Sequence, residues 1–179
     1  ALMHALGLAM RETPSESGQQ LFEMLTHRSE TSIALRAMDG IARSRSIKSS
    51  GRVIEMLSSP EVVLRRKAAD ILGELGANDG RSPLIEALND DDPLVRGLSA
   101  WSLGELDDET VAPHLVKALD DRGWSVAINA AGALAKLGEV ETGPSICKAL
   151  QNPRGNVHLT TNLLLASAAT KAPCGLSSA

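Results

Sequence analysis

Apolar residues recur along the chain at the spacing of one face of a helix. Leu64, Ala68, Leu72 and Leu75 lie three or four residues apart, so at about 100° per residue their side chains share one side. Charged residues such as Arg66 occupy positions between them. The pattern predicts an amphipathic helix, and it is written twice more, at Val95, Ser99, Leu103 and Leu106 and at Val126, Ala130, Leu134 and Leu137.

This helical pattern returns at a constant interval along the chain. Equivalent positions in successive copies differ by 31 in their numbering. A fixed period of this length predicts an array of structural repeats. Small residues at one repeated position are expected to let neighbouring helices approach closely. Two series of positions have this spacing between successive members. One is Gly73, Gly104, Ala135 and Ala166, and the other is Ile33, Leu64, Val95, Val126 and Val157.

Each repeat is predicted to hold two helices joined by a polar turn. The turns NDDDP, DDRGW and NPRGN are rich in residues that favour turns and helix N-caps. The second helices end at Leu-Gly or Leu-Asp pairs, where Gly76 and Gly138 suit a left-handed C-cap. One helical hairpin cannot bury its apolar face alone, so hairpins must stack in series. The first helices of the repeats are expected to end at equivalent leucines, which are Leu57, Leu88, Leu119 and Leu150.

The unbroken period predicts one continuous domain over residues 1–179. The last segment is small and polar, and it is expected to fray. We expect the end helix of a preceding repeat at 1–11, repeats at 14–45, 46–76, 77–107, 108–138 and 139–170, and a tail at 171–179.

The composition indicates an aliphatic core without aromatic bulk. Of the 179 residues 43% are hydrophobic but only 2% are aromatic, and the net charge is −4. Two cysteines, Cys147 and Cys174, are too few for a disulfide framework, so we expect two free thiols in a reducing, cytoplasmic compartment. No apolar run approaches the roughly 18 residues of a membrane span. The apolar start of the chain is interpreted as a helix and not as a signal segment.

The segment from Asp90 to Leu106 carries the fullest form of a recognisable repeat pattern. It reads D-x-x-P-x-V-R, then a pair of small residues, then L-G-x-L. This pattern resembles HEAT repeats, in particular the short, regular type named after phycobilisome lyases, and the resemblance covers roughly residues 17–169. It implies an all-α fold, a right-handed α-α superhelix of about five helical hairpins. It also implies that the second helices line a concave surface for binding.

The resemblance further implies a ladder of turn aspartates and arginines through the stack. Its expected members are Asp91 and Asp92 with Arg65 and Arg96. The equivalent positions hold Ala34, Ala127 and His158, so the ladder should be broken at both ends.

The side chains opposite the core face of the second helices form the predicted partner-binding surface. Five apolar residues in line on a solvated face would suggest a contact site. Trp101 is its expected anchor, with Gly97 and Gly132 leaving room beside it. The alternative is that Trp101 packs between helices and the leucines face a missing cap. The predicted contact residues are Trp101, Leu98, Ile128, Leu159, Arg66, Lys67, Asp70, Glu105, Arg36 and Arg43.

Other chemistry is not expected from this sequence. The four histidines have no metal-ligand spacing, no phosphate-binding loop occurs, and no Ser or Cys nucleophile has a His in a known motif. No catalytic residue, metal or cofactor is therefore predicted. Nine basic residues oppose four acidic ones between positions 28 and 67, but no aromatic residues stand among them, so nucleic-acid binding is not expected. Trp124, in a turn, is expected to fold over its own helix end.

These observations favour a non-catalytic scaffold that binds a protein or peptide on its concave face. Two alternatives remain. The resemblance allows a bilin lyase or isomerase subunit, although the sequence offers few aromatic residues for a tetrapyrrole. The chain could also be a structural segment of a larger protein, in which case exposed end helices would allow self-association. No membrane partner is expected.

Overall fold

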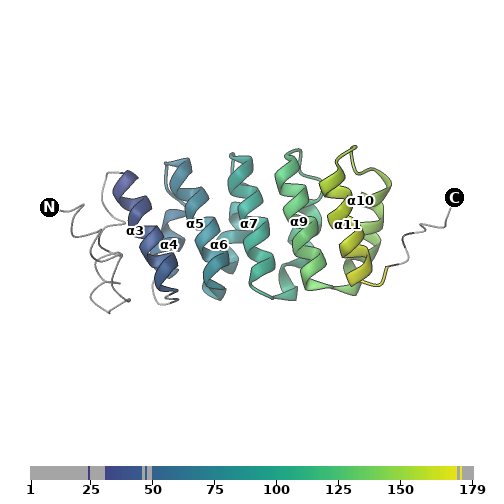
Figure 1. Cartoon of the computed structure of the whole chain (residues 1–179), viewed down its shortest axis with the longest axis horizontal. Helices are drawn as coiled ribbons and strands as arrows, with labels where there is room; N and C mark the ends of the chain where they lie inside the picture. The colour runs from purple at the N-terminus through teal and green to yellow at the C-terminus, as the bar shows by residue number, and fades with distance from the viewer. Residues whose placement is uncertain (1–23, 25–30, 46, 48–49, 173, 175–179) are drawn as a thin grey trace.

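The computed structural model describes residues 24, 31–45, 47, 50–172 and 174, and every regular element in these ranges is helical. The prediction for residues 1–11 and the first helix of the first repeat lie outside the described residues. Figure 1 shows the longer helices side by side along the molecule. The elements are α3 (Thr31–Ser44), α4 (Ser50–Met56), α5 (Val62–Leu75), α6 (Arg81–Ala87), α7 (Pro93–Glu105), α8 (Ala112–Ala118), α9 (Trp124–Leu137), α10 (Gly143–Gln151) and α11 (Val157–Ala169), with short 3-10 turns Asn78–Gly80, Glu109–Val111 and Val140–Thr142 before α6, α8 and α10.

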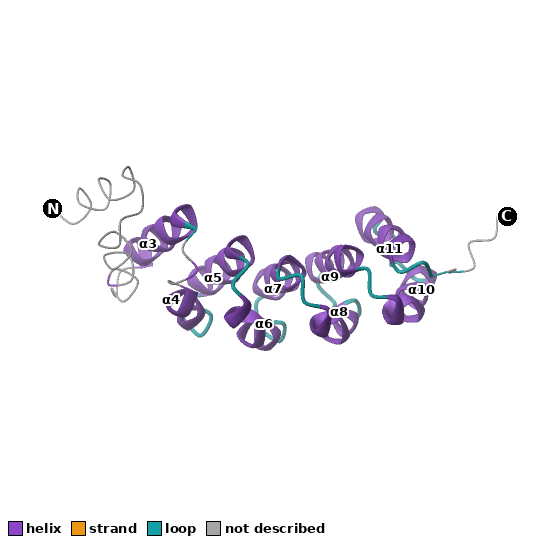
Figure 2. Cartoon of the chain, turned by 90° about the horizontal axis from the view of Figure 1, so that it is seen from below, coloured by secondary structure: helices purple, strands orange, loops and turns teal. Residues whose placement is uncertain are grey.

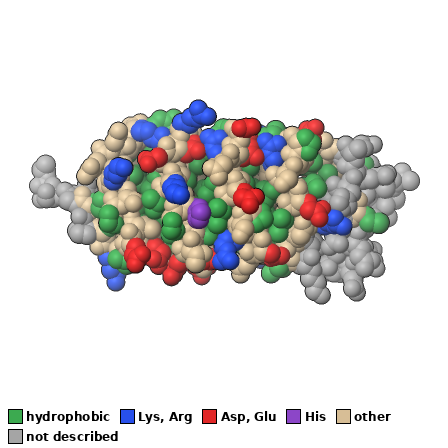
Figure 3. Space-filling model, turned by 180° about the vertical axis from the view of Figure 1, so that it is seen from behind, with side chains coloured by type: hydrophobic (Ala, Val, Ile, Leu, Met, Phe, Trp, Pro, Cys, Tyr) green, Lys and Arg blue, Asp and Glu red, His purple; other side chains and the backbone are tan. Residues whose placement is uncertain are grey.

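The helices form two layers that curve together. The longer second helices α3, α5, α7, α9 and α11 lie on the inner side of the arc, and the shorter helices α4, α6, α8 and α10 lie on the outer side (Figure 2). Figure 3 shows the outer face, where acidic and basic side chains are scattered among apolar ones. The second helices therefore line the concave surface.

The core between the layers is aliphatic, as the composition predicted. Leu72, Leu103 and Leu134, one from each central repeat, are fully buried. Gly76 and Gly138 end α5 and α9 in the left-handed conformation, with φ of 60° and 66°. The expected C-caps thus terminate these helices and release the chain towards the next hairpin.

Neighbouring second helices touch through their backbones. A Cβ atom placed on Gly73 would lie 2.5 Å from the Ser102 Oγ, and one on Gly104 would lie 2.6 Å from the Ala133 Cβ. The Ser102 hydroxyl also donates to the main-chain oxygen of Ala69 at 2.7 Å. The predicted role of small residues at these positions is confirmed, because no side chain fits there.

The repeat period lengthens by two residues at the last hairpin. The N-cap residues Glu61, Asp92 and Gly123 are evenly spaced, but Asn156 comes two residues later than the same spacing predicts. Two observations explain the difference. Helix α10 has 9 residues where α6 and α8 have 7. The loop after it also bends through a left-handed Arg154 and Gly155, with φ of 53° and 71°.

This shift corrects the expected register of α11. Val157 does not take the core position of Val126, because it is 75% exposed whereas Val126 is fully buried. Leu159, 3% exposed, takes that core position instead. Leu163 is likewise buried. The sequence alignment at a constant period is therefore wrong for this one helix.

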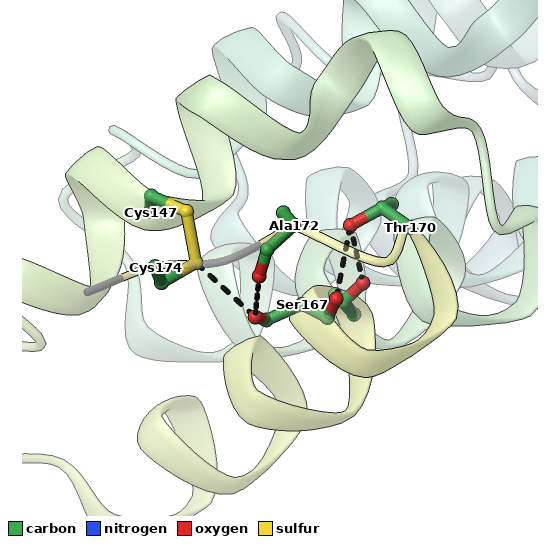
Figure 4. Close-up of a disulfide and its surroundings, with 6 residues drawn as sticks. Cys147, Ser167, Thr170, Ala172 and Cys174 are labelled. Atoms are coloured by element: carbon green, nitrogen blue, oxygen red, sulfur yellow. Dashed lines mark hydrogen bonds between the residues drawn. A yellow bond between two sulfur atoms is a disulfide. The ribbon is translucent and has the colours of Figure 1, made fainter. Parts of the chain in front are cut away.

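The start of the C-terminal tail is fastened to the last hairpin. Ala172 donates its N–H to the main-chain oxygen of Ser167 at 3.0 Å, and the Ser167 hydroxyl donates to the main-chain oxygen of Ala172 at 3.0 Å. This turn brings Cys174 to Cys147 on α10, and the two form a disulfide with their Cα atoms 4.8 Å apart (Figure 4). The prediction of two free thiols is wrong, because Cys174 is bonded to Cys147. Lys171, Ala172 and Cys174 are the only tail residues within the described part of the chain, and the rest of the predicted tail lies outside it.

Candidate functional site

Asparagine side chains on the concave surface connect α9 to α7 and α11 to α9. The Asn129 side-chain amide donates to the main-chain oxygen of Gly97 at 2.9 Å, and that of Asn162 donates to the main-chain oxygen of Ile128 at 2.9 Å. These two bonds are equivalent once α11 is shifted by two residues. Rows of side chains therefore run across the concave surface from helix to helix.

The middle of the concave surface is apolar and partly open. Leu98, Trp101 and Ile128 are each partly exposed, and Leu98 and Ile128 also pack against the core. Gly97 and Gly132 add no side chain of their own, and the side-chain amides of Asn129 and Asn162 lie against them. Trp101 is thus neither enclosed between helices nor fully solvated.

One expected member of the apolar strip is absent from this surface. Leu159 is buried, because the shifted register turns it into the core. The same shift moves Leu165, which is 57% exposed, into the row of Trp101 and Gly132. Sequence reasoning missed Leu165. The longer first helix α10 and the Arg154–Gly155 pair were the signals that could have revealed the shift.

The basic side chains expected near the N-terminal half are largely paired. Arg66 binds Asp92 through two hydrogen bonds of 2.8 and 2.5 Å. This contact lowers the pKa of the Asp92 carboxyl to about 2. Lys67 lies between Asp39 and Asp70, with its Nζ 2.9 and 3.8 Å from their oxygens.

Burial alone would lower the pKa of Lys67, but the hydrogen bond to Asp39 and the nearby carboxylates outweigh burial and raise it. Arg36 and Arg43 are exposed, and neither forms an ion pair within the ranges that the structure describes. The expected basic patch is therefore reduced to these two side chains.

A further pair crosses from α7 to α9. The Lys136 Nζ lies 2.8 Å from a carboxylate oxygen of Glu105, one 31-residue repeat away. This contact shows that side chains one repeat apart in a row come within ion-pair distance of each other.

Arginine–aspartate pairs also tie together the turns on one edge of the stack. Arg65 binds Asp90 at 2.7 and 3.0 Å, and Arg96 binds Asp121 at 2.8 and 3.0 Å. Each arginine thus reaches the turn of the following repeat. The hydrogen bond from Arg65 lowers the pKa of Asp90.

Burial would raise the pKa of Asp121, but the hydrogen bond from Arg96 reverses that effect and lowers it. Two expected ladder members behave differently. Asp92 pairs with Arg66, while Asp91 is exposed and makes no side-chain bond to the rest of the described chain.

The Trp124 side chain lies at the edge where this ladder stops. It begins α9 and is 44% exposed. The Arg154 guanidinium lies over its ring, 5.0 Å from the centroid. Trp124 therefore contacts the last loop through Arg154.

The described residues also bear on metal binding, on the depressions of the outer layer and on membrane spanning. They contain no group of three His, Cys, Asp or Glu side chains able to hold a metal ion. The depressions on the outer layer are shallow and lie between neighbouring short helices, for example where Ile85 and Glu86 face His114 and Lys117. Across these residues, no helix combines the length and apolar character needed to cross a membrane.

Stacked helical hairpins with their longer helices inside define an α-α solenoid. Residues 50–135 and 82–160 match the family model of HEAT repeats. The chain therefore belongs to the HEAT-repeat family, and the predicted all-α HEAT-like solenoid is confirmed.

Solved structures of other proteins have a similar fold. A chain in the complex of CpcE and CpcF of phycocyanin lyase from Nostoc sp. PCC7120 matches with a TM-score of 0.76 and 24% identity, over 89% of this chain and 67% of that one. An engineered protein matches with a TM-score of 0.68 and 17% identity, over 95% and 90% of the two chains. A designed armadillo repeat protein matches with a TM-score of 0.61 and 16% identity, over 94% and 91%. No protein of curated function matches the sequence.

Proposed function

We propose that this chain is a non-catalytic scaffold that binds a protein or peptide partner on its concave surface. The observation that carries the proposal is the partly open position of Trp101 between Leu98, Ile128 and the two glycines. Aromatic side chains in such positions contribute much of the free energy of binding at protein interfaces. Leu165 extends the apolar strip towards the C-terminal end of the array.

The family supports this proposal. The stacking of hairpins produces a long curved surface, which is the usual binding surface of repeat proteins. The structural neighbour from Nostoc is itself a chain in a complex of two proteins, CpcE and CpcF. Among the predicted contact residues, Leu98, Ile128, Asp70, Glu105, Arg36 and Arg43 stay in the proposal, Arg66 and Lys67 serve mainly to pair with aspartates, and Leu159 is replaced by Leu165.

Replacing Trp101 by alanine tests the proposal. Trp101→Ala should weaken partner binding by about 2 kcal/mol or more, while the far-ultraviolet circular dichroism stays unchanged. Trp124→Phe is the matched control, because it changes the other tryptophan on the edge of the stack. The proposal fails if Trp101→Ala unfolds the chain, or if partners captured by the parent chain bind this variant equally well.

The likeness to a phycocyanin lyase chain favours a second candidate, a subunit that handles a bilin. The match is to the fold alone at this identity. Mixing the chain with a bilin and recording the absorption spectrum tests this candidate. A red-shifted and enhanced band that Trp101→Ala removes would favour it over the scaffold, and an unchanged bilin spectrum would exclude it.

A further inference from the structure

The carboxylates around Trp101 indicate what kind of partner side chain the concave surface accepts. Glu105 lies four residues after Trp101 on α7, so the two side chains are neighbours on one helix face. Asp70 and Glu74 occupy the same two positions one repeat earlier, on the adjacent helix α5. The contact between Lys136 and Glu105 shows that such rows bring side chains together across helices.

The charges of this region do not balance. Lys67 is shared by Asp39 and Asp70, and Lys136 pairs with Glu105. Glu74 is exposed, and its side chain has no hydrogen bond or ion pair in the parts of the chain that are described. On α5, α7 and α9, the helix of Trp101 and its two neighbours, the ammonium groups of Lys67 and Lys136 thus stand against three carboxylates, those of Asp70, Glu74 and Glu105, while the exposed Arg36 and Arg43 lie farther away on α3. A bound partner could supply the missing positive charge.

The chain already uses its other tryptophan to hold a cation. The Arg154 guanidinium lies over the ring of Trp124 at 5.0 Å from the centroid, within the range of a favourable cation–π contact. Trp101 has no such cation among the described residues. On α7, Leu98 precedes Trp101 by three residues and Glu105 follows it by four, so both lie on the same face of the helix as the indole.

We infer that the concave surface binds a peptide segment in which a lysine or arginine lies over Trp101, with an apolar side chain next to it. The cationic head would lie near Glu74 and Glu105, and its aliphatic stem would cover the indole. The apolar neighbour would contact Ile128 and Leu165. This inference rests on the proposed function, because it names the chemistry of the partner for the same surface.

A first experiment needs no partner. In a Trp124→Phe chain, only Trp101 fluoresces as a tryptophan, and its quenching by caesium and by iodide is compared at constant ionic strength after normalisation to free N-acetyltryptophanamide. Caesium should quench about twofold more efficiently than iodide, because the carboxylates attract the cation. Glu74→Lys should remove or reverse that preference. Glu86→Lys, the same charge change on the outer helix α6, should leave it intact.

Equal quenching by the two ions, or stronger quenching by iodide, would overturn the inference without touching the proposed function. The same holds if Glu86→Lys alters the preference as much as Glu74→Lys does.

A second experiment measures binding of three labelled peptides that differ at one position. The parent peptide carries a lysine beside two leucines, and the others carry norleucine or glutamate in place of the lysine. The lysine peptide should bind about tenfold more tightly than the glutamate peptide, and Glu74→Lys should abolish the difference. Glu86→Lys should preserve it.

The outcomes separate the two proposals. If all three peptides bind equally and Trp101→Ala releases all of them, the inference is wrong and the scaffold proposal stands. If no peptide binds in a way that depends on Trp101, both are wrong.

Discussion

Arg154 donates a hydrogen bond from the loop before α11 to the main-chain oxygen of Asp121, at 2.7 Å. Its other guanidinium nitrogen donates to the main-chain oxygen of Leu119 at 3.3 Å. In the preceding repeat Arg96, on the second helix, donates to the equivalent of the Asp121 oxygen, that of Asp90, and also to the oxygen of Asp91. The position equivalent to Arg96 in α9 is Ala127. Arg154 therefore supplies from the next loop the donor that α9 lacks.

Removing this donor should destabilise the last hairpin. Arg154→Ala is expected to lower the free energy of unfolding by about 1 to 2 kcal/mol, because two carbonyl oxygens lose a charged partner. Hydrogen exchange should become faster in α11 and in the turn before α9. Arg122→Ala is the control, since Arg122 is exposed in the same turn and forms no side-chain hydrogen bond in the described part of the chain. Equal effects of the two substitutions would contradict this role.

Filling the contact between α7 and α9 should be costly. Gly104→Val places atoms where the Ala133 Cβ and Cα already lie, within 2.8 Å of an added Cβ, so we expect a loss of about 2 to 4 kcal/mol in chemical denaturation. Gly51→Ala is the control. A Cβ at Gly51 would meet nothing within 4 Å, so this change should be neutral or slightly stabilising in a helix. A tolerated Gly104→Val would mean that the helices are not in backbone contact.

The register of α11 can be tested with two leucines. Leu159→Ala should cost about 2 to 4 kcal/mol, because Leu159 is 3% exposed in the core. Leu165→Ala should change stability by less than about 1 kcal/mol, because that side chain is 57% exposed. Thermal or urea unfolding of the two variants decides between the registers. The opposite ranking would restore the constant spacing of the sequence alignment.

The sequence predicted the stack well because its evidence is periodic. Gly73 and Gly104 mark close contacts, and Gly76 marks a helix end, through local rules that repetition reinforces. The register of α11 could not be predicted in the same way. Leu159, Leu163, Leu164 and Leu165 are all apolar, so the hydrophobic pattern fits two alignments, and only the loop geometry at Arg154 distinguishes them.

The candidate site was predicted less completely for a different reason. The sequence named Trp101, Leu98 and Ile128, which are partly exposed in the structure, but it could not show which charges pair with each other. Arg66 and Lys67 pair with aspartates of the same chain. The disulfide was not predicted for the same reason. Cys147 and Cys174 have a sequence separation of 27, and only the folded tail brings them together.

The pairing of Asp92 with Arg66 makes stability depend on pH in the acid range. The pKa of Asp92 is lowered to about 2 in the folded chain, whereas the pKa of an aspartate in the unfolded chain is about 4. Its contribution is therefore complete above about pH 4 and is lost as the pH falls through about 2. Urea unfolding at these two pH values measures the effect. As the pH falls from about 4 to about 2, the free energy of unfolding should fall by about 1 to 2 kcal/mol more for the parent chain than for Asp92→Asn.

Asparagine is a suitable replacement in that comparison because it still accepts at the N-cap of α7. Asp91→Asn, at the exposed neighbouring position, should behave like the parent chain. If the parent and Asp92→Asn lose stability in parallel with falling pH, the ion pair contributes nothing.

Reduction should weaken the C-terminal end of the array. The disulfide between Cys147 and Cys174 closes a loop of 27 residues, and loss of this constraint on the unfolded chain should cost about 3 to 4 kcal/mol. The unfolding midpoint should therefore fall in dithiothreitol. A chain with both Cys147→Ser and Cys174→Ser should be insensitive to the reductant. An unchanged midpoint for the parent would argue against the linkage.

The backbone contacts at Gly73 and Gly104 all lie on the inner layer of the arc. Tightening the arc would force atoms of α5, α7 and α9 to overlap, whereas straightening it only draws those helices apart. The array should consequently bend more easily towards a wider concave surface than towards a narrower one. A large bound partner can widen the concave surface, but a small one cannot narrow it.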